Sequence, residues 1–133
     1  MTLVLDTSGL VALANRRDPS HRRAVDALQG DPGPYVVPAG ILAEAAYVLE
    51  ARLGVASLES FLQDLEEGRL LLDRGDRDLA RIRELVLRYA DLPLGLADAA
   101  VVACAERRGA GVLTLDRRGF DVVAGEGTIR LVP

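Results

Sequence analysis

Two short apolar runs near opposite ends of this chain each stop on an aspartate. Residues 2–6 read TLVLD and residues 111–116 read GVLTLD, while a third run, YVVP at 35–38, is followed by a helical pattern. Short runs rich in Val and Leu are typical of buried strands. Strands that alternate with helices predict an α/β fold with a mostly parallel sheet covered on both faces, since parallel neighbours require crossover connections.

The expected elements follow one another without a repeat or a long linker, so we expect a single domain that spans residues 1–133. A chain of this length buries roughly two thirds of the surface that its unfolded form exposes, which is enough for a substantial core. Strands are expected at 2–6, 35–38, 69–73, 112–115 and 128–132. Helices are expected at about 7–16, 19–29, 40–53, 57–67, 76–90 and 96–108, with only a turn between the last two strands.

The composition narrows the chemistry that the chain can perform. One cysteine, Cys104, excludes an internal disulfide and a multi-cysteine zinc site. All sixteen basic residues are arginine, so no lysine is available for Schiff-base chemistry, and the one histidine excludes a two-histidine acid–base pair. The start of the chain lacks a basic leader and no apolar run reaches the roughly 18 residues of a membrane span, so we expect a cytoplasmic protein without a membrane partner.

Several other α/β protein classes lack a residue that they require. A phosphoacceptor receiver domain gathers aspartates at strand ends but needs a lysine near them. A haloacid-dehalogenase phosphatase needs a second aspartate two positions after the first, where this chain has Ser8. The GAGVL segment at 109–113 precedes a strand rather than following one, and no GxxxxGK[ST] loop occurs, so neither nucleotide-binding motif is present.

Four acidic residues are expected at one edge of the sheet. Ligands of open α/β sheets bind at the carboxyl ends of the strands, where Asp6 and Asp116 stand. Glu44 lies in the first turns of the helix after the second strand, and this helix begins at the same edge. Asp98 begins a helix that precedes the fourth strand and runs antiparallel to it, so its amino end lies there too. The topology alone therefore predicts that four carboxylates converge.

The surroundings of two of these acids favour a cation. Asp98 and Glu44 each lie among apolar residues at helical spacing, which predicts that both occupy core-facing stripes. Carboxylates there are costly unless paired, protonated or bound to metal, and two charges about 4 Å apart repel by about 4 kcal/mol at an effective dielectric near 20. All-oxygen ligands suit Mg²⁺ or Mn²⁺. Taken singly, each acid has an alternative role as a turn cap or a first-turn residue favoured by the helix dipole.

The motifs around these acids resemble those of a known family. Four segments, which together span nearly the whole chain, are similar in sequence and in order to PIN domains. They are most similar to the VapC-type toxins of bacterial and archaeal toxin–antitoxin modules. The resemblance implies a PIN-like α/β/α sandwich with a central, mostly parallel five-stranded sheet of strand order 3-2-1-4-5. The segments are VLDTSGLVAL (4–13), ILAEAAYVL (41–49), YADLPLGLADAAVVACAERRG (89–109) and VLTLDRRGFDVV (112–123).

The resemblance also implies an activity. The implied protein is a metal-dependent endoribonuclease that acts as the toxin of a type II toxin–antitoxin module. In such an enzyme a metal-activated water hydrolyses RNA and leaves a 5′-phosphate and a 3′-hydroxyl. Ser8 and Thr114 match the accessory polar positions of the family. Its catalytic positions, which bind Mg²⁺ or Mn²⁺, are matched by Asp6, Glu44, Asp98 and Asp116.

Partners are implied in the same way. We expect Arg117 and Arg118, which follow the last acid, to contact phosphates of a tRNA or rRNA substrate. The family also implies a homodimer and a VapB-like antitoxin that docks between the helices at 40–53 and 57–67. Asp91 is a further acid to which the sequence assigns no role. The two helices carry more apolar residues than one core face requires: Ile41, Leu42, Leu49, Leu53, Leu58, Phe61, Leu62 and Leu65.

Two functional alternatives stay open at this level. One is a PIN-fold nuclease that processes RNA without an antitoxin; a small upstream gene for a DNA-binding protein would argue against it. The other is a PIN-fold protein without catalysis that serves as a binding module. The complete set of four acids argues against this second alternative, and a metal titration would test it.

Overall fold

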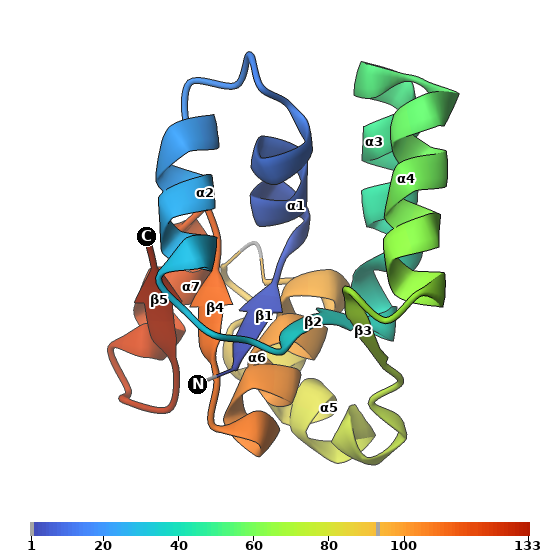
Figure 1. Ribbon diagram of the computed structural model, residues 1–133. Helices are drawn as coiled ribbons and strands as arrows, with labels where there is room; N and C mark the ends of the chain where they lie inside the picture. The colour runs from blue at the N-terminus through green and yellow to red at the C-terminus, as the bar shows by residue number, and fades with distance from the viewer. Residues whose placement is uncertain (1, 93) are drawn as a thin grey trace.

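The computed structural model describes residues 2–92 and 94–133. Its centre is a sheet of β1 (Leu3–Leu5), β2 (Tyr35–Pro38), β3 (Leu71–Asp73), β4 (Gly111–Leu113) and β5 (Arg130–Val132). The strand order is β3-β2-β1-β4-β5 and every neighbouring pair is parallel (Figure 1). The implied order is therefore confirmed, and the described sheet is fully rather than mostly parallel.

Helices cover both faces of this sheet. On one face α6 (Leu96–Arg108) lies against β1, β2 and β4, with α5 (Leu79–Arg88) and α7 (Arg118–Ala124) packed beside it. On the other face α1 (Thr7–Ala14) packs against α2 (His21–Gln29), which contacts β4 (Figure 1). The expected α/β/α sandwich is thus confirmed. No helix in the described ranges has both the length and the apolar character needed to cross a bilayer.

A helical hairpin projects beside this sandwich. It consists of α3 (Leu42–Leu53) and α4 (Val55–Glu66), and α3 packs against α1 (Figure 1). The two helices are joined by Gly54, whose φ of 91° suits glycine and ends α3. Because one residue makes this turn, α4 begins two residues earlier than the expected position 57.

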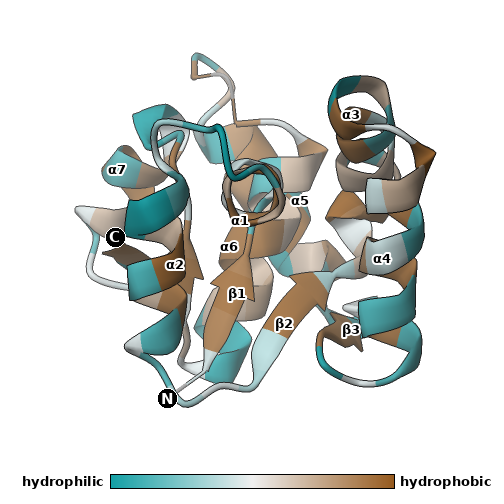
Figure 2. Ribbon diagram, turned by 45° about the horizontal axis from the view of Figure 1, so that its top comes forward, coloured by the Kyte–Doolittle hydropathy of each residue, from teal (hydrophilic) through white to brown (hydrophobic). Residues whose placement is uncertain are grey.

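The strands and α6 form the core. β1 is buried along its whole length, and so is every residue from 99 to 105 of α6. Figure 2 shows apolar strands at the centre of the molecule and hydrophilic patches on the outer helices. Neighbouring helices and the sheet enclose α6 together, which explains why its middle turns are buried on all sides.

Other helix starts also differ from expectation. Asp6 caps α1, because its side chain accepts a hydrogen bond from the backbone N–H of Gly9. α2 begins at His21, two residues later than expected. Residues 39–41 and 76–78 form 3₁₀ turns ahead of α3 and α5, which shortens both α-helices at their amino ends.

The largest error concerns α7, where only a turn is expected from the sequence. Its seven residues include Gly119 and two valines, which are poor helix formers, and a helix this short is not stable alone. Phe120 and Val123, three positions apart, are buried in the core. Tertiary burial of these two side chains therefore stabilises a helix that local propensity does not predict.

Two arginines at the end of α6 tie this helix to the edge of the sheet. Arg107 donates hydrogen bonds to Asp73 at 2.6 Å and to Asp78 at 2.8 Å, and Arg108 donates to Asp73 at 2.6 Å. Burial acts to raise the pKa of Asp73, but the two guanidinium groups outweigh it and lower that pKa. This ion cluster anchors the helix that carries Asp98 at its other end.

Candidate functional site

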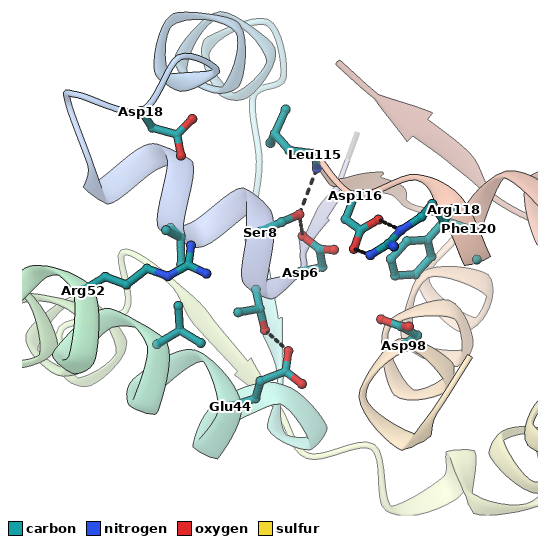
Figure 3. A pocket seen from close by; sticks show the side chains of 14 residues that line it. Asp6, Ser8, Asp18, Glu44, Arg52, Asp98, Leu115, Asp116, Arg118 and Phe120 are labelled. Atoms are coloured by element: carbon teal, nitrogen blue, oxygen red, sulfur yellow. Dashed lines mark hydrogen bonds and ion pairs between the residues drawn. The ribbon is translucent and has the colours of Figure 1, made fainter. Parts of the chain in front are cut away.

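A pocket of about 300 Å³ opens at the carboxyl ends of β1 and β4 (Figure 3). Asp6 directly follows β1, and Asp116 lies in the loop between β4 and α7. Glu44 and Asp98 stand in the first turns of α3 and α6. All four acids line this pocket although their segments are far apart in the sequence.

Asp6 is the acid that the protein holds most firmly. It is only 6% exposed, and one carboxylate oxygen accepts hydrogen bonds from the Gly9 N–H and the Ser8 hydroxyl, both at 2.8 Å. The other oxygen accepts one from the Thr114 hydroxyl at 2.7 Å. Burial raises the pKa of Asp6, and the negative charge of Asp116 adds to this, while the three hydrogen bonds act in the opposite direction.

Ser8 and Thr114 also fix the loop that carries Asp116. The backbone N–H of Leu115 donates to the Ser8 Oγ at 2.9 Å, and that of Asp116 donates to the Thr114 Oγ1 at 3.1 Å. Each hydroxyl therefore donates to the Asp6 carboxylate and accepts from the loop. The position of this loop relative to β1 depends on these two side chains.

Two glycines allow the elements of the site to approach closely. A Cβ on Gly9 would lie 2.6 Å from the carbonyl oxygen of Leu113, so α1 can begin against the end of β4 only without a side chain there. A Cβ on Gly40 would lie 2.6 Å from the Cβ of Ala100, so the turn before α3 packs directly on α6. Both contacts are tighter than a Cβ tolerates, and they bring the acid-bearing elements together.

Asp98 is the acid whose ionisation the pocket opposes most clearly. Burial, followed by the negative charges of Asp6, Glu44 and Asp116, raises its pKa from 3.8 to about 6. Within the described residues, its carboxylate accepts no hydrogen bond, whereas the hydrogen bonds to Asp6 and to Asp116 act to lower the pKa values of those two groups. Its oxygens are therefore available to a ligand.

Glu44 lies at the exposed side of the pocket. Its carboxylate accepts a hydrogen bond from the Thr7 hydroxyl at 2.6 Å, which links α3 to the first residue of α1. The expected core-facing position is wrong, because Ala45 and Leu49 form the buried stripe of α3 and Glu44 is exposed beside them.

Asp116 forms an ion pair with Arg118. Its two oxygens accept from Nε and Nη2 of Arg118 at 3.0 and 3.1 Å, and this guanidinium lowers the pKa of Asp116. Arg117 lies outside the pocket lining and donates to Asp121 at 3.1 Å and to the carbonyl of Pro133 at 3.2 Å. Both arginines expected to contact RNA thus bind protein acceptors in this conformation, and their RNA contacts stay a prediction.

The donor chemistry of the pocket fits a hard divalent cation. Five carboxylates and two guanidiniums line it, so negative charge is in excess, and all the acidic donors are oxygens. In residues 2–92 and 94–133, however, no group of three or more acidic, histidine or cysteine side chains is arranged to hold a metal ion. Arg118, which occupies both oxygens of Asp116, and Thr7, which occupies one oxygen of Glu44, would compete with an ion for these two acids.

The pocket also contains residues without a role in the sequence-based site. Arg52 lies eight positions after Glu44 on α3. This helical spacing could have predicted that both side chains lie on the same face of the helix. Asp18 comes from the loop between α1 and α2, which no pattern marks, and Phe120 comes from the unexpected helix α7. Asp91 is exposed and lies outside the lining of this pocket.

A second, more apolar groove of about 430 Å³ lies between α1, α2 and α4. Leu49 and Phe61 line it, but both are also core residues, as is Ile41. Of the eight apolar residues singled out on the two helices, Leu62 alone is an exposed large hydrophobic in the described structure, at 47%. The interpretation that these residues exceed what the core needs is therefore largely wrong.

Known proteins resemble this chain in sequence and in structure. Residues 3–126 match the profile of the PIN domain. Ribonuclease VapC26 of Mycobacterium tuberculosis is 31% identical over 135 residues, which cover 98% of this chain and 100% of that protein. VapC20 of the same organism, a sarcin–ricin loop cleaving toxin, superposes with a TM-score of 0.82 at 19% identity and covers 99% of this chain and 100% of its own.

A toxin–antitoxin structure shares the fold as well. VapBC2 from Rickettsia felis, bound to a DNA fragment from their promoter, contains a chain that superposes with a TM-score of 0.71 at 18% identity. The match covers 98% of this chain and 97% of that one. Likeness at this identity shows the fold, whereas the profile match and the relationship to VapC26 extend over nearly all the sequence. The chain belongs to the PIN-domain family.

Proposed function

We propose that this chain is a divalent-metal-dependent endoribonuclease of the VapC type and acts as the toxin of a type II toxin–antitoxin module. Membership of the PIN-domain family and the relationship to Ribonuclease VapC26 support RNA hydrolysis. The observation that carries the proposal is the half-buried Asp98 carboxylate, without a hydrogen-bond donor in the described structure, in a pocket with four further acids. Such a group destabilises a fold by itself and suits a site that binds cations.

In this proposal the four acids hold the metal. They are all-oxygen donors, which suits Mg²⁺ or Mn²⁺ better than a softer metal. A bound cation supplies the charge that lowers the pKa of water and stabilises negative charge on the phosphodiester. The ligands are Asp6, Glu44, Asp98 and Asp116.

In this proposal, neighbouring residues position the acids or contact the RNA. Ser8 and Thr114 hold Asp6 in place and fix the loop from 114 to 116. Arg118, after release from Asp116, would be free to contact an RNA phosphate, and we assign Arg117 a weaker contact at the rim. Hydrolysis adds water across the P–O3′ bond, so the products carry a 5′-phosphate and a 3′-hydroxyl.

We propose a tRNA or an rRNA as the substrate. VapC20, which shares the fold, cleaves the sarcin–ricin loop, so an oligonucleotide of that loop is the first RNA to test. The chain has only five aromatic residues, too few for a platform that stacks successive bases. Recognition would therefore depend on RNA shape and on the phosphate backbone.

An antitoxin is the second partner in this proposal. The fold shared with VapBC2 and the apolar groove between α1, α2 and α4 support the docking of an apolar antitoxin segment beside the α3–α4 hairpin. A homodimer is supported by large apolar side chains that are exposed on α5 and at the start of α6, namely Leu79 at 64%, Leu87 at 74% and Leu96 at 63%. We also propose a cytoplasmic location, where tRNA and rRNA substrates would be available.

Cleavage of a mixed tRNA and rRNA preparation tests the activity. Purified protein is incubated in Mg²⁺, in Mn²⁺ and in EDTA, with the Asp98→Asn variant as the blank. Discrete cuts that require both the metal and Asp98, and whose products carry a 5′-phosphate, are the expected result. Cuts that persist in EDTA or in the variant at the wild-type rate would refute the metal-site assignment.

A further inference from the structure

The two arginines of the pocket differ in what they bind. Arg118 donates to both oxygens of Asp116 at 3.0 and 3.1 Å. Arg52 lines the same pocket, yet its guanidinium has no hydrogen bond and no ion pair within the described residues. Figure 3 shows its side chain reaching from α3 into the pocket. The guanidinium of Arg52 is therefore available to a ligand.

Arg52 stands on the same face of α3 as Glu44. The two residues are eight positions apart, which corresponds to about 12 Å along the helix axis. Val48, midway between them, also lines the pocket. One wall of the pocket thus presents an acid, an apolar side chain and a base in a row, so a chain-like ligand bound at the acids and lying along α3 would meet Arg52.

The acid at this end of the pocket forms no ion pair with Arg52 within the described residues. Asp18 lines the pocket, and its carboxylate accepts a hydrogen bond from the backbone N–H of Ser20 at 2.8 Å. The planar fork of donors of Arg52 therefore has no partner within the described residues, and it matches two oxygens of one phosphate.

We propose that Arg52 binds a backbone phosphate of the substrate RNA, at least one nucleotide away from the phosphodiester that is cleaved beside the four acids. This inference rests on the proposed ribonuclease function. The RNA strand would run along α3 from Glu44 toward Arg52. Arg52 is a positioning residue rather than a catalytic one, because it lies two helical turns from Glu44 and would hold the strand instead of the reacting atoms.

Binding of RNA tests this role independently of cleavage. Fluorescence anisotropy measures the affinity of a labelled single-stranded RNA oligonucleotide in EDTA over a series of salt concentrations. Arg52→Gln should weaken binding about three- to tenfold, and the slope of log K against log salt should fall by about 0.7, the value for one lost phosphate contact on a single strand. Arg52→Lys keeps the charge and should restore most of the slope but only part of the affinity.

Arg130→Gln is the matched control. Arg130 is exposed on β5, lies outside the pocket and has no ion pair in the described structure, so the substitution removes one charge away from the proposed binding surfaces. The salt slope of this variant should equal that of the wild type. If Arg52→Gln and Arg130→Gln gave the same slope and the same affinity, Arg52 would not bind phosphate and the proposal would be overturned.

Two further measurements separate the remaining explanations. In Mg²⁺, Arg52→Gln should raise KM while kcat stays within about twofold, as expected for a contact outside the reacting centre. If Arg52 only balanced the charge of Asp18, the effect of Arg52→Gln on RNA affinity would disappear in the Asp18→Asn background, which would overturn the proposal. A wild-type protein that binds RNA with this Arg52-dependent slope but never cleaves it would overturn the nuclease function and leave the phosphate contact standing.

Binding of a protein partner by the Arg52→Gln variant also tests the phosphate assignment. If the variant bound RNA as the wild type does, but bound an antitoxin more weakly, Arg52 would belong to the protein interface. That result would overturn the phosphate assignment.

Discussion

Replacement of Asp98 by asparagine should stabilise the protein in EDTA while it abolishes RNA cleavage. The pKa of Asp98 in the folded protein is about 6, above its ordinary value of 3.8, so ionisation of this carboxyl is less favourable in the pocket than in the unfolded chain. Its unfavourable contribution is fully present above the folded pKa and is lost as the pH falls from about 6 toward 3.8. The amide keeps the size of the side chain and removes the charge.

The magnitude follows from the change in pKa. A rise from 3.8 to about 6 corresponds to about 3 kcal/mol at alkaline pH, at about 1.36 kcal/mol for each pKa unit. Asp98 is only half-buried, so solvent screening reduces this to about 1–2 kcal/mol. For a domain of this size, the expected gain in Tm is roughly 3–8 °C.

Thermal melts at about pH 8 and about pH 4.5, both in EDTA, measure this gain. Asp91→Asn is the control, because Asp91 is exposed and outside the pocket lining and the substitution makes the same change of charge. The Asp98→Asn variant should melt above the wild type at the higher pH and close to it at the lower pH. An equal gain at both pH values, or none at either, would refute the inference that charge repulsion and burial destabilise ionised Asp98.

Three further changes probe the elements around this acid. Arg118→Gln should free Asp116 from its guanidinium partner and raise the affinity for Mn²⁺, measured by titration calorimetry; an unchanged affinity would mean that the ion pair does not compete with the metal. Gly40→Ala should lower stability by about 1–3 kcal/mol in urea unfolding, because the new Cβ would lie 2.6 Å from that of Ala100. Ser8→Ala should lower stability by about 1–3 kcal/mol and reduce cleavage, since it leaves a loop N–H without its acceptor; wild-type values in both assays would argue against a positioning role.

Much of the architecture could be predicted from local pattern alone. The helix from Leu96 to Arg108 has the expected boundaries, because Gly109 ends it in a left-handed conformation that few other residues adopt readily. The parallel strands follow from their alternation with helices. The helix at 118–124 could not be predicted, because it depends on the burial of Phe120 and Val123 against elements that are remote in the sequence.

The sequence by itself determined that four acidic residues lie at one edge of a parallel sheet, because the order of strands and helices decides which end of each element reaches that edge. It did not determine which partner each charged group has. That Asp116 binds Arg118, that Asp98 lacks a hydrogen-bond donor in the described structure, and that Arg52 faces the pocket unpaired depend on distances between distant segments. Only the tertiary structure decided these, since burial and Coulomb interactions act through space rather than along the chain.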